Sequence, residues 1–129
     1  MNKQIILTAS FLGLLAVVLG AFGAHGLEGK ISEYQIGTWK TANQYHFYHT
    51  LALLFLSTFS RAKNASIRLS FLAFTIGIVL FSGSLYLLSV RSLLGIESVS
   101  ILGPITPIGG LFFMVGWIGL FVAAVRNRS

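Results

Sequence analysis

The residues best suited to chemistry lie in the first half of the segment 39–60, which reads WKTANQYHFYHTLALLFLSTFS. Asn43, Gln44, His46 and His49 are polar, whereas the second half of the segment is mostly apolar. Residues three apart are neighbours on a helix face, and His46 and His49 have the H-x-x-H spacing seen in some metal sites. Polar groups within a membrane usually face the interior of a helix bundle and often mark function. The segment therefore predicts a polar helix face that holds a candidate site.

A metal site is one interpretation of these histidines. Its candidate ligands are His25, His46 and His49, with Glu28 close to His25 in the sequence. In the other interpretation, each histidine hydrogen-bonds to a Ser, Tyr or Asn side chain on a facing helix and holds the bundle together. Haem ligation would need histidines on facing helices, whereas His46 and His49 share one helix. The sequence favours interhelical hydrogen bonds and establishes no cofactor.

The composition is that of a membrane protein. Of 129 residues, 55% are apolar and only 9% are charged, and the mean hydropathy is +0.84. A soluble domain carries about 25% charged residues, and roughly 20 apolar residues are needed to cross the hydrocarbon core of a bilayer. Four such segments, at 5–24, 39–60, 69–90 and 105–125, use most of the chain. We therefore expect a single transmembrane domain over residues 1–129.

Several classes of function are excluded by residues that the sequence lacks. It has no cysteine, which removes disulfides, iron–sulfur clusters and thiolate metal sites. It has no aspartate and only three glutamates, so catalysis by paired carboxylates is nearly excluded. The net charge of +6 is spread over the ends of the apolar segments, so we expect no nucleic-acid partner. No standard nucleotide-binding or hydrolase motif occurs, and nothing in the sequence supports an enzyme.

The expected fold is an all-α integral membrane protein, an antiparallel bundle of four transmembrane helices, because short connections make successive helices antiparallel neighbours. With the N and C termini in the cytoplasm, six of the nine Lys and Arg residues lie inside, as the positive-inside rule favours. We therefore expect a multi-pass protein of the cytoplasmic (inner) membrane. The apolar run after Lys3 also resembles a signal peptide with a cleavage site at 21–23, but we expect it to be retained as a span.

Small residues recur at helical spacing on the first and fourth segments. The first stripe consists of Ala9, Gly13, Ala16, Gly20 and Ala24. The fourth segment has glycines at positions 109, 110, 116 and 119. Such stripes let helix backbones approach closely in a membrane. Because these stripes exceed what one bundle needs, we expect a homo-oligomer or an accessory subunit of a membrane complex.

The expected topology gathers polar groups in the outer half of the membrane. Segment 39–60 descends from the outside, which places His46 about 10 Å and His49 about 15 Å below Trp39. The third segment rises and brings Ser82 and Tyr86 into the same half. These groups suggest a pocket for a small amphipathic ligand such as a lipid or a quinone. The candidate ligand-binding residues are His25, Asn43, Tyr45, His46, His49, Ser82 and Tyr86.

Four blocks of the sequence resemble one known family. GAFGAHGL at 20–27 precedes the pattern W-x-T-A-x-x-Y-x-x-x-H at 39–49, and FSGSLY at 81–86 and TPIGG at 106–110 follow in order. These blocks are similar to the small membrane proteins of domain of unknown function 423, a family that includes the eukaryotic transmembrane protein 256. The resemblance spans essentially the whole chain and implies an inner-membrane protein with four spans, but it implies no activity. The signature blocks fall on His25, Trp39, Tyr45, His49, Tyr86 and Pro107.

Three hypotheses for function follow from the sequence. The leading one is a non-enzymatic binding or accessory protein with a polar pocket in the outer leaflet. The second is a small oligomeric transporter or channel, although no acidic residue lies within a predicted span to couple protons. The third is a metal- or haem-binding redox protein that uses His25, His46 and His49.

Overall fold

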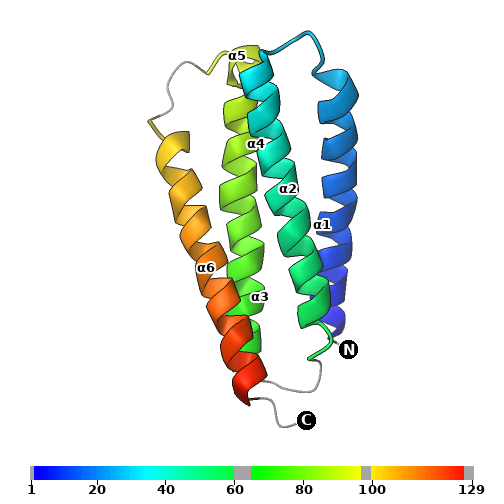
Figure 1. The fold of residues 1–129 in the computed structure, drawn as a ribbon, viewed down its shortest axis with the longest axis vertical. Helices are drawn as coiled ribbons and strands as arrows, with labels where there is room; N and C mark the ends of the chain where they lie inside the picture. The colour runs from blue at the N-terminus through cyan, green and yellow to red at the C-terminus, as the bar shows by residue number, and fades with distance from the viewer. Residues whose placement is uncertain (1, 60–64, 97–99, 127–129) are drawn as a thin grey trace.

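The computed structural model describes residues 2–59, 65–96 and 100–126. Within these ranges the chain is helical and contains no strand. Its elements, in chain order, are α1 (Lys3–Ala21), η1 (Phe22–Gly26), α2 (Glu33–Leu56), α3 (Ala65–Gly77), η2 (Ile78–Ser82), α4 (Gly83–Ser89), α5 (Arg91–Leu94) and α6 (Leu102–Arg126). The π-helical turn η1 continues α1, and the π-helical turn η2 joins α3 to α4. The long elements are therefore four rods, α1–η1, α2, α3–η2–α4 and α6 (Figure 1).

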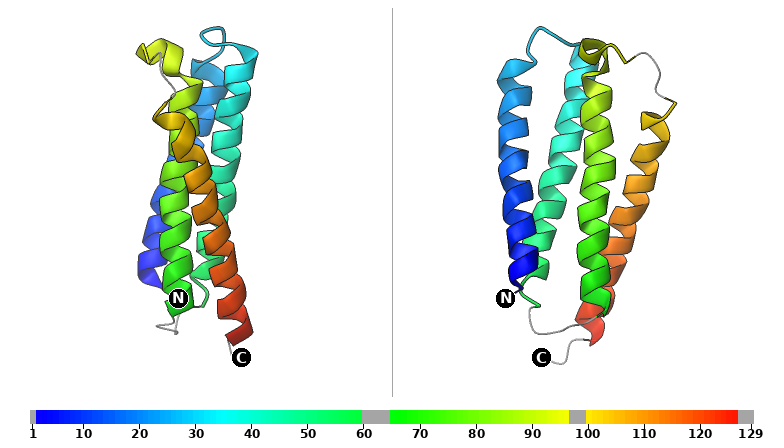
Figure 2. Two further views of the ribbon diagram at one scale, coloured as in Figure 1. Left: turned by 90° about the vertical axis from the view of Figure 1, so that its left-hand side faces the viewer. Right: turned by 180° about the vertical axis from the view of Figure 1, so that it is seen from behind.

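Successive rods run in opposite directions, and the start of α1 and the end of α6 lie at the same end of the bundle (Figure 1). α2 packs against α1 on one side and against η2 and α4 on the other, whereas α6 packs mainly against α3 and η2 (Figure 2). Three rods of the described chain, Lys3–Gly26, Ala65–Ser89 and Leu102–Arg126, are long and apolar enough to cross a membrane. α2 is comparably long but more polar, and it is not among them. The expected all-α membrane fold is confirmed.

α2 begins at Glu33, six residues before the predicted segment 39–60, because a capping box starts the helix there. The Ser32 hydroxyl accepts a hydrogen bond from the Gln35 backbone N–H at 3.2 Å, and the Gln35 side-chain oxygen accepts one from the Ser32 backbone N–H at 3.1 Å. These bonds satisfy N–H groups that a helix start leaves unpaired. The Ser89 hydroxyl donates to the Gln35 carbonyl at 2.5 Å and so joins the start of α2 to the end of α4.

The small residues of α1 face α2. Ala16 is fully buried, and a Cβ atom at Gly13 would lie 3.6 Å from Cγ2 of Thr50. A Cβ atom at Gly20 would lie only 2.9 Å from the side-chain oxygen of Asn43. The stripe therefore lets the polar residues of α2 come close to the backbone of α1.

The glycines of α6 face α3 and η2 in the same way. A Cβ atom at Gly116 would lie 2.5 Å from Cδ1 of Phe74, and one at Gly109 would lie 2.7 Å from Cα of Phe81 in η2. At Gly109 the backbones of two helices are therefore in direct contact. The glycine stripes that suggested contacts between copies are used within one chain, and an oligomer remains a prediction without that support.

The adjacent glycines 109 and 110 should respond oppositely to the same substitution. Gly109→Ala places its methyl group against the backbone of η2 and should destabilise the protein by about 1–3 kcal/mol, the usual cost of overpacking. Gly110→Ala meets only Cδ2 of Phe81, at 3.9 Å, and should leave stability unchanged or slightly raised. Thermal unfolding in detergent, followed by circular dichroism, measures both. Equal losses of stability in the two variants would contradict this packing.

Candidate functional site

The polar face of α2 is divided between two neighbouring helices. A step of three residues turns about 60° around the helix axis, so His46 and His49 diverge although they are neighbours. The His46 ring hydrogen-bonds to Tyr86 of α4, whereas the His49 ring hydrogen-bonds to Trp117 of α6. The structure separates the two histidines that the sequence suggested as one pair.

Asn43, His46 and Tyr86 form a hydrogen-bonded cluster, here called the interhelical lock, in which His46 and Tyr86 are buried and Asn43 is half-buried. The Asn43 amide donates to the Ala16 carbonyl of α1 at 2.9 Å and to the Tyr86 hydroxyl oxygen of α4 at 3.1 Å. Nδ1 of His46 lies 2.9 Å from the same Tyr86 oxygen. The lock therefore joins α1, α2 and α4 through side-chain hydrogen bonds.

The bonds within the lock assign the proton on His46. The Tyr86 oxygen already accepts from Asn43, so its own proton is free to be donated to Nδ1 of His46. Nε2 of His46 then carries the ring proton. This atom is buried without a hydrogen-bond partner in the described chain, although the Leu12 backbone interacts with the ring. The polar atoms of the lock are thus almost all hydrogen-bonded to one another or to the α1 backbone.

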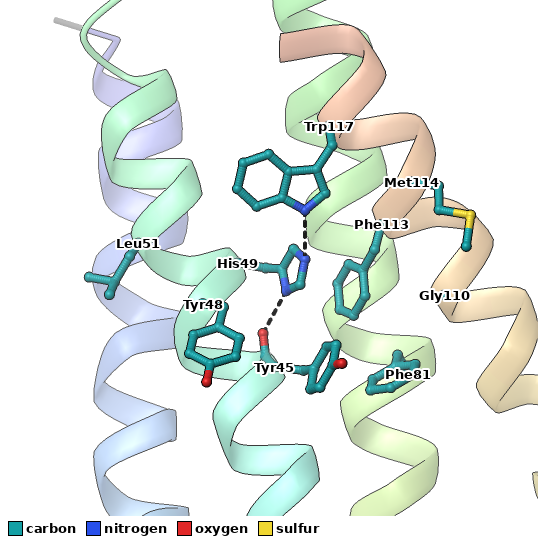
Figure 3. A pocket seen from close by; sticks show the side chains of 9 residues that line it. All are labelled: Tyr45, Tyr48, His49, Leu51, Phe81, Gly110, Phe113, Met114 and Trp117. Atoms are coloured by element: carbon teal, nitrogen blue, oxygen red, sulfur yellow. Dashed lines mark hydrogen bonds between the residues drawn. The ribbon is translucent and has the colours of Figure 1, made fainter. Parts of the chain in front are cut away.

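A groove lies between α2 and α6, with η2 at its base. Its volume is about 710 Å³. Figure 3 shows the side chains that line it, contributed by all three elements. They are Tyr45, Tyr48, His49, Leu51, Phe81, Gly110, Phe113, Met114 and Trp117. Among the residues that the structure describes, no charged side chain lines this space, here called the α2–α6 groove.

His49 connects the two sides of the α2–α6 groove. The Trp117 indole N–H donates to Nε2 of His49 at 3.1 Å, and Nδ1 of His49 lies 2.7 Å from the Tyr45 carbonyl (Figure 3). An indole can only donate and a carbonyl can only accept, so Nε2 is unprotonated and Nδ1 carries the proton. The imidazole also stacks on Phe113, with ring centroids 3.5 Å apart and planes 5° from parallel. Both nitrogens are therefore occupied, and His49 acts as a fixed wall of the groove.

Tyr45 and Tyr48 supply the free polar groups of the groove. Their rings lie 5.8 Å apart and are 38% and 54% exposed. Neither hydroxyl makes a hydrogen bond to any residue that the structure describes. The two phenol groups can therefore donate to, or accept from, a molecule in the groove.

The remaining predicted site residues lie elsewhere. His25 is exposed in η1 at the end of the bundle. Ser82 is fully buried in η2, and its hydroxyl has no partner in the described chain. Among the residues that the structure describes, no three His, Cys, Asp or Glu side chains lie close enough to hold a metal ion. The structure therefore does not assemble His25, His46 and His49 into a metal site.

The α6 side of the groove was not predicted from the sequence. Phe113 and Trp117 are four residues apart, so they lie on the same face of α6, and they line the groove together with Gly110. In an apolar segment these residues resemble ordinary lipid-facing positions. The available signal was the spacing G-x-x-F-x-x-x-W, which leaves a gap beside two aromatic rings.

Removing the same atom from two tyrosines should separate the lock from the groove. Tyr86→Phe leaves Asn43 and His46 without their shared partner and should destabilise the protein by about 1–3 kcal/mol. Tyr45→Phe removes a hydroxyl that has no partner within the described chain, so it should leave stability unchanged or raise it. Unfolding of both variants in the same detergent measures the difference. A Tyr86→Phe protein as stable as Tyr45→Phe would contradict the lock.

Similarity to known proteins assigns the chain to a family. Residues 19–110 match the family model described as protein of unknown function (DUF423). The chain is 49% identical over 128 residues to the UPF0382 membrane protein YwdK of Bacillus subtilis, a match that covers 96% of this chain and 98% of the relative. It is 40% identical over 124 residues to the UPF0382 membrane protein SAB0533 of Staphylococcus aureus, covering 96% and 97% of the two chains. No solved structure matches it. The chain therefore belongs to the DUF423 family, as its four sequence blocks indicated.

Proposed function

We propose that this membrane protein binds a small amphipathic molecule of the bilayer in the α2–α6 groove. The observation that carries the proposal is a groove of about 710 Å³ with aromatic walls and two tyrosine hydroxyls that lack partners within the described chain. Ligand sites are typically concave, mostly apolar and provided with a few polar groups that fix orientation. The polar atoms of the interhelical lock are already hydrogen-bonded and its residues do not line the groove, so the proposed site contains Tyr45 and His49 but not Asn43, His46 or Tyr86.

The proposal includes α2 as a fourth membrane span. Its 24 residues extend about 36 Å, which exceeds the roughly 30 Å of hydrocarbon in a bilayer. It packs between α1 and α4, so a membrane that surrounds those helices surrounds α2 as well. The hydrogen bonds of Asn43 and His46 to neighbouring helices offset the cost of burying its polar face. The distribution of Lys and Arg supports cytoplasmic termini in the inner membrane.

Single cysteines test this topology, because the chain has none of its own. Glu28 and Thr58 are exposed positions that flank α2 at opposite ends. In intact cells, a membrane-impermeant maleimide should label Glu28→Cys directly and Thr58→Cys only after the membrane is opened. Labelling of both positions from one side would show that α2 does not span.

Filling the groove should remove its ligand. A Cβ atom at Gly110 has room, so Gly110→Leu should fold and should fill space beside Phe81. Gly103→Leu is the matched control, because a Cβ atom there meets nothing within 4 Å and Gly103 lies outside the groove. Native mass spectrometry after gentle extraction should find a small molecule bound in fixed stoichiometry to the wild type and to Gly103→Leu, and at least about tenfold less on Gly110→Leu. Equal retention by all three proteins would contradict binding in the groove.

A further inference from the structure

We infer that the α2–α6 groove takes a neutral, flat, carbonyl-bearing ring on an apolar tail, which is the chemistry of an isoprenoid quinone. The inference rests on the ligand-binding function proposed above and names the class of the ligand. It follows from three properties of the groove: its depth, its free polar groups and its shape.

The depth of the groove makes its unpaired hydroxyls informative. Tyr45 lies about 18 Å along α2, close to the middle of a helix about 36 Å long. Tyr48 is one turn further on. At this depth no bulk water is present to satisfy a polar group, so a hydroxyl that faces lipid alone is costly. A ligand that offers an oxygen acceptor removes that cost.

The free polar groups of the groove select a neutral acceptor. Nδ1 and Nε2 of His49 and the Trp117 N–H are already used in hydrogen bonds to each other and to the Tyr45 carbonyl. Within the described ranges, no Lys, Arg, Asp or Glu side chain lines the groove to pair with a charged headgroup. The two phenol hydroxyls remain, and they are well suited to donate to carbonyl oxygens. A phosphate or an ammonium headgroup would be unpaired at this depth.

The shape of the groove selects a flat ring with a tail. The ring of Tyr45 lies 4.8 Å from that of Phe81, and His49 stacks on Phe113, so aromatic surfaces line the interior. Flat conjugated rings pack favourably against such surfaces. Leu51 and Met114 at the rim are 59% and 61% exposed, so the groove opens sideways. A tail can therefore leave the groove directly into the acyl chains.

Quenching of tryptophan fluorescence tests the inference. Trp117 lines the groove and is 48% exposed, whereas Trp39 is 5% exposed, so a quinone in the groove acts mainly on Trp117. The protein is placed in nanodiscs of phosphatidylcholine and titrated with decylubiquinone. Wild type should show saturable quenching, and Gly110→Leu only the linear quenching of freely dissolved quinone. The double variant Tyr45→Phe/Tyr48→Phe should raise the apparent Kd at least about tenfold, because it loses two hydrogen bonds.

Tyr34→Phe is the matched control, because Tyr34 is 85% exposed outside the groove, and its Kd should equal that of the wild type. An unchanged Kd in the double variant would overturn the role of the hydroxyls, and with it the inference. The single variants Tyr45→Phe and Tyr48→Phe replace the double variant if the double variant does not fold.

The two experiments together separate this inference from the proposed function. If native mass spectrometry finds a species that Gly110→Leu loses, yet decylubiquinone quenches wild type and Gly110→Leu alike, the groove binds another class of ligand and only this inference fails. If neither method shows a difference, the proposed function fails as well.

Discussion

Hydrocarbon offers no hydrogen bonds, and under the proposed four-span topology this constraint governs how α2 sits in the bundle. In that topology α2 carries Asn43, His46 and His49 within the membrane, where it is stable only if neighbouring helices satisfy those side chains. Asn43 reaches the Ala16 carbonyl because the small residues of α1 leave that backbone accessible. His46 and Asn43 then share the Tyr86 hydroxyl of α4. The position of α2 between α1 and α4 is therefore fixed by polar bonds as well as by packing.

The groove is a consequence of how α6 joins this arrangement. Gly109 brings α6 into backbone contact with η2, and the ring of Phe74 packs against Gly116. α6 therefore packs closely against the rod α3–η2–α4. α6 meets α2 through the Trp117–His49 hydrogen bond and the stack of His49 on Phe113. Above Gly110, where no side chain projects, an open space remains between the two helices. The groove therefore lies between two contacts of α6: its glycines contact α3 and η2, and its aromatic rings contact α2.

The sequence was sufficient for the helices and for the polar residues of α2, because apolar runs and polar interruptions are local properties. It was not sufficient to assign partners, because these depend on how each helix is rotated in the bundle. His46 and His49 show this, since neighbours on one helix bind α4 and α6 respectively. The π-helical turn η2 adds a residue to one turn and so rotates the face that α4 presents to its neighbours. No sequence pattern predicted this turn. Phe113 and Trp117 were missed because an aromatic ring in a span resembles any lipid-facing residue until its neighbours are known.

We conclude that the polar half of α2 performs two separate tasks, as part of a hydrogen-bonded lock and as one wall of an open groove. The ¹⁵N NMR spectrum of the imidazole rings in nanodiscs tests it most directly, with His46 and His49 assigned by single His→Gln variants. We predict opposite neutral tautomers, with the proton on Nε2 of His46 and on Nδ1 of His49. Identical tautomers in the two rings would contradict the hydrogen bonds to Tyr86 or to Trp117, and with them the division of α2 between lock and groove.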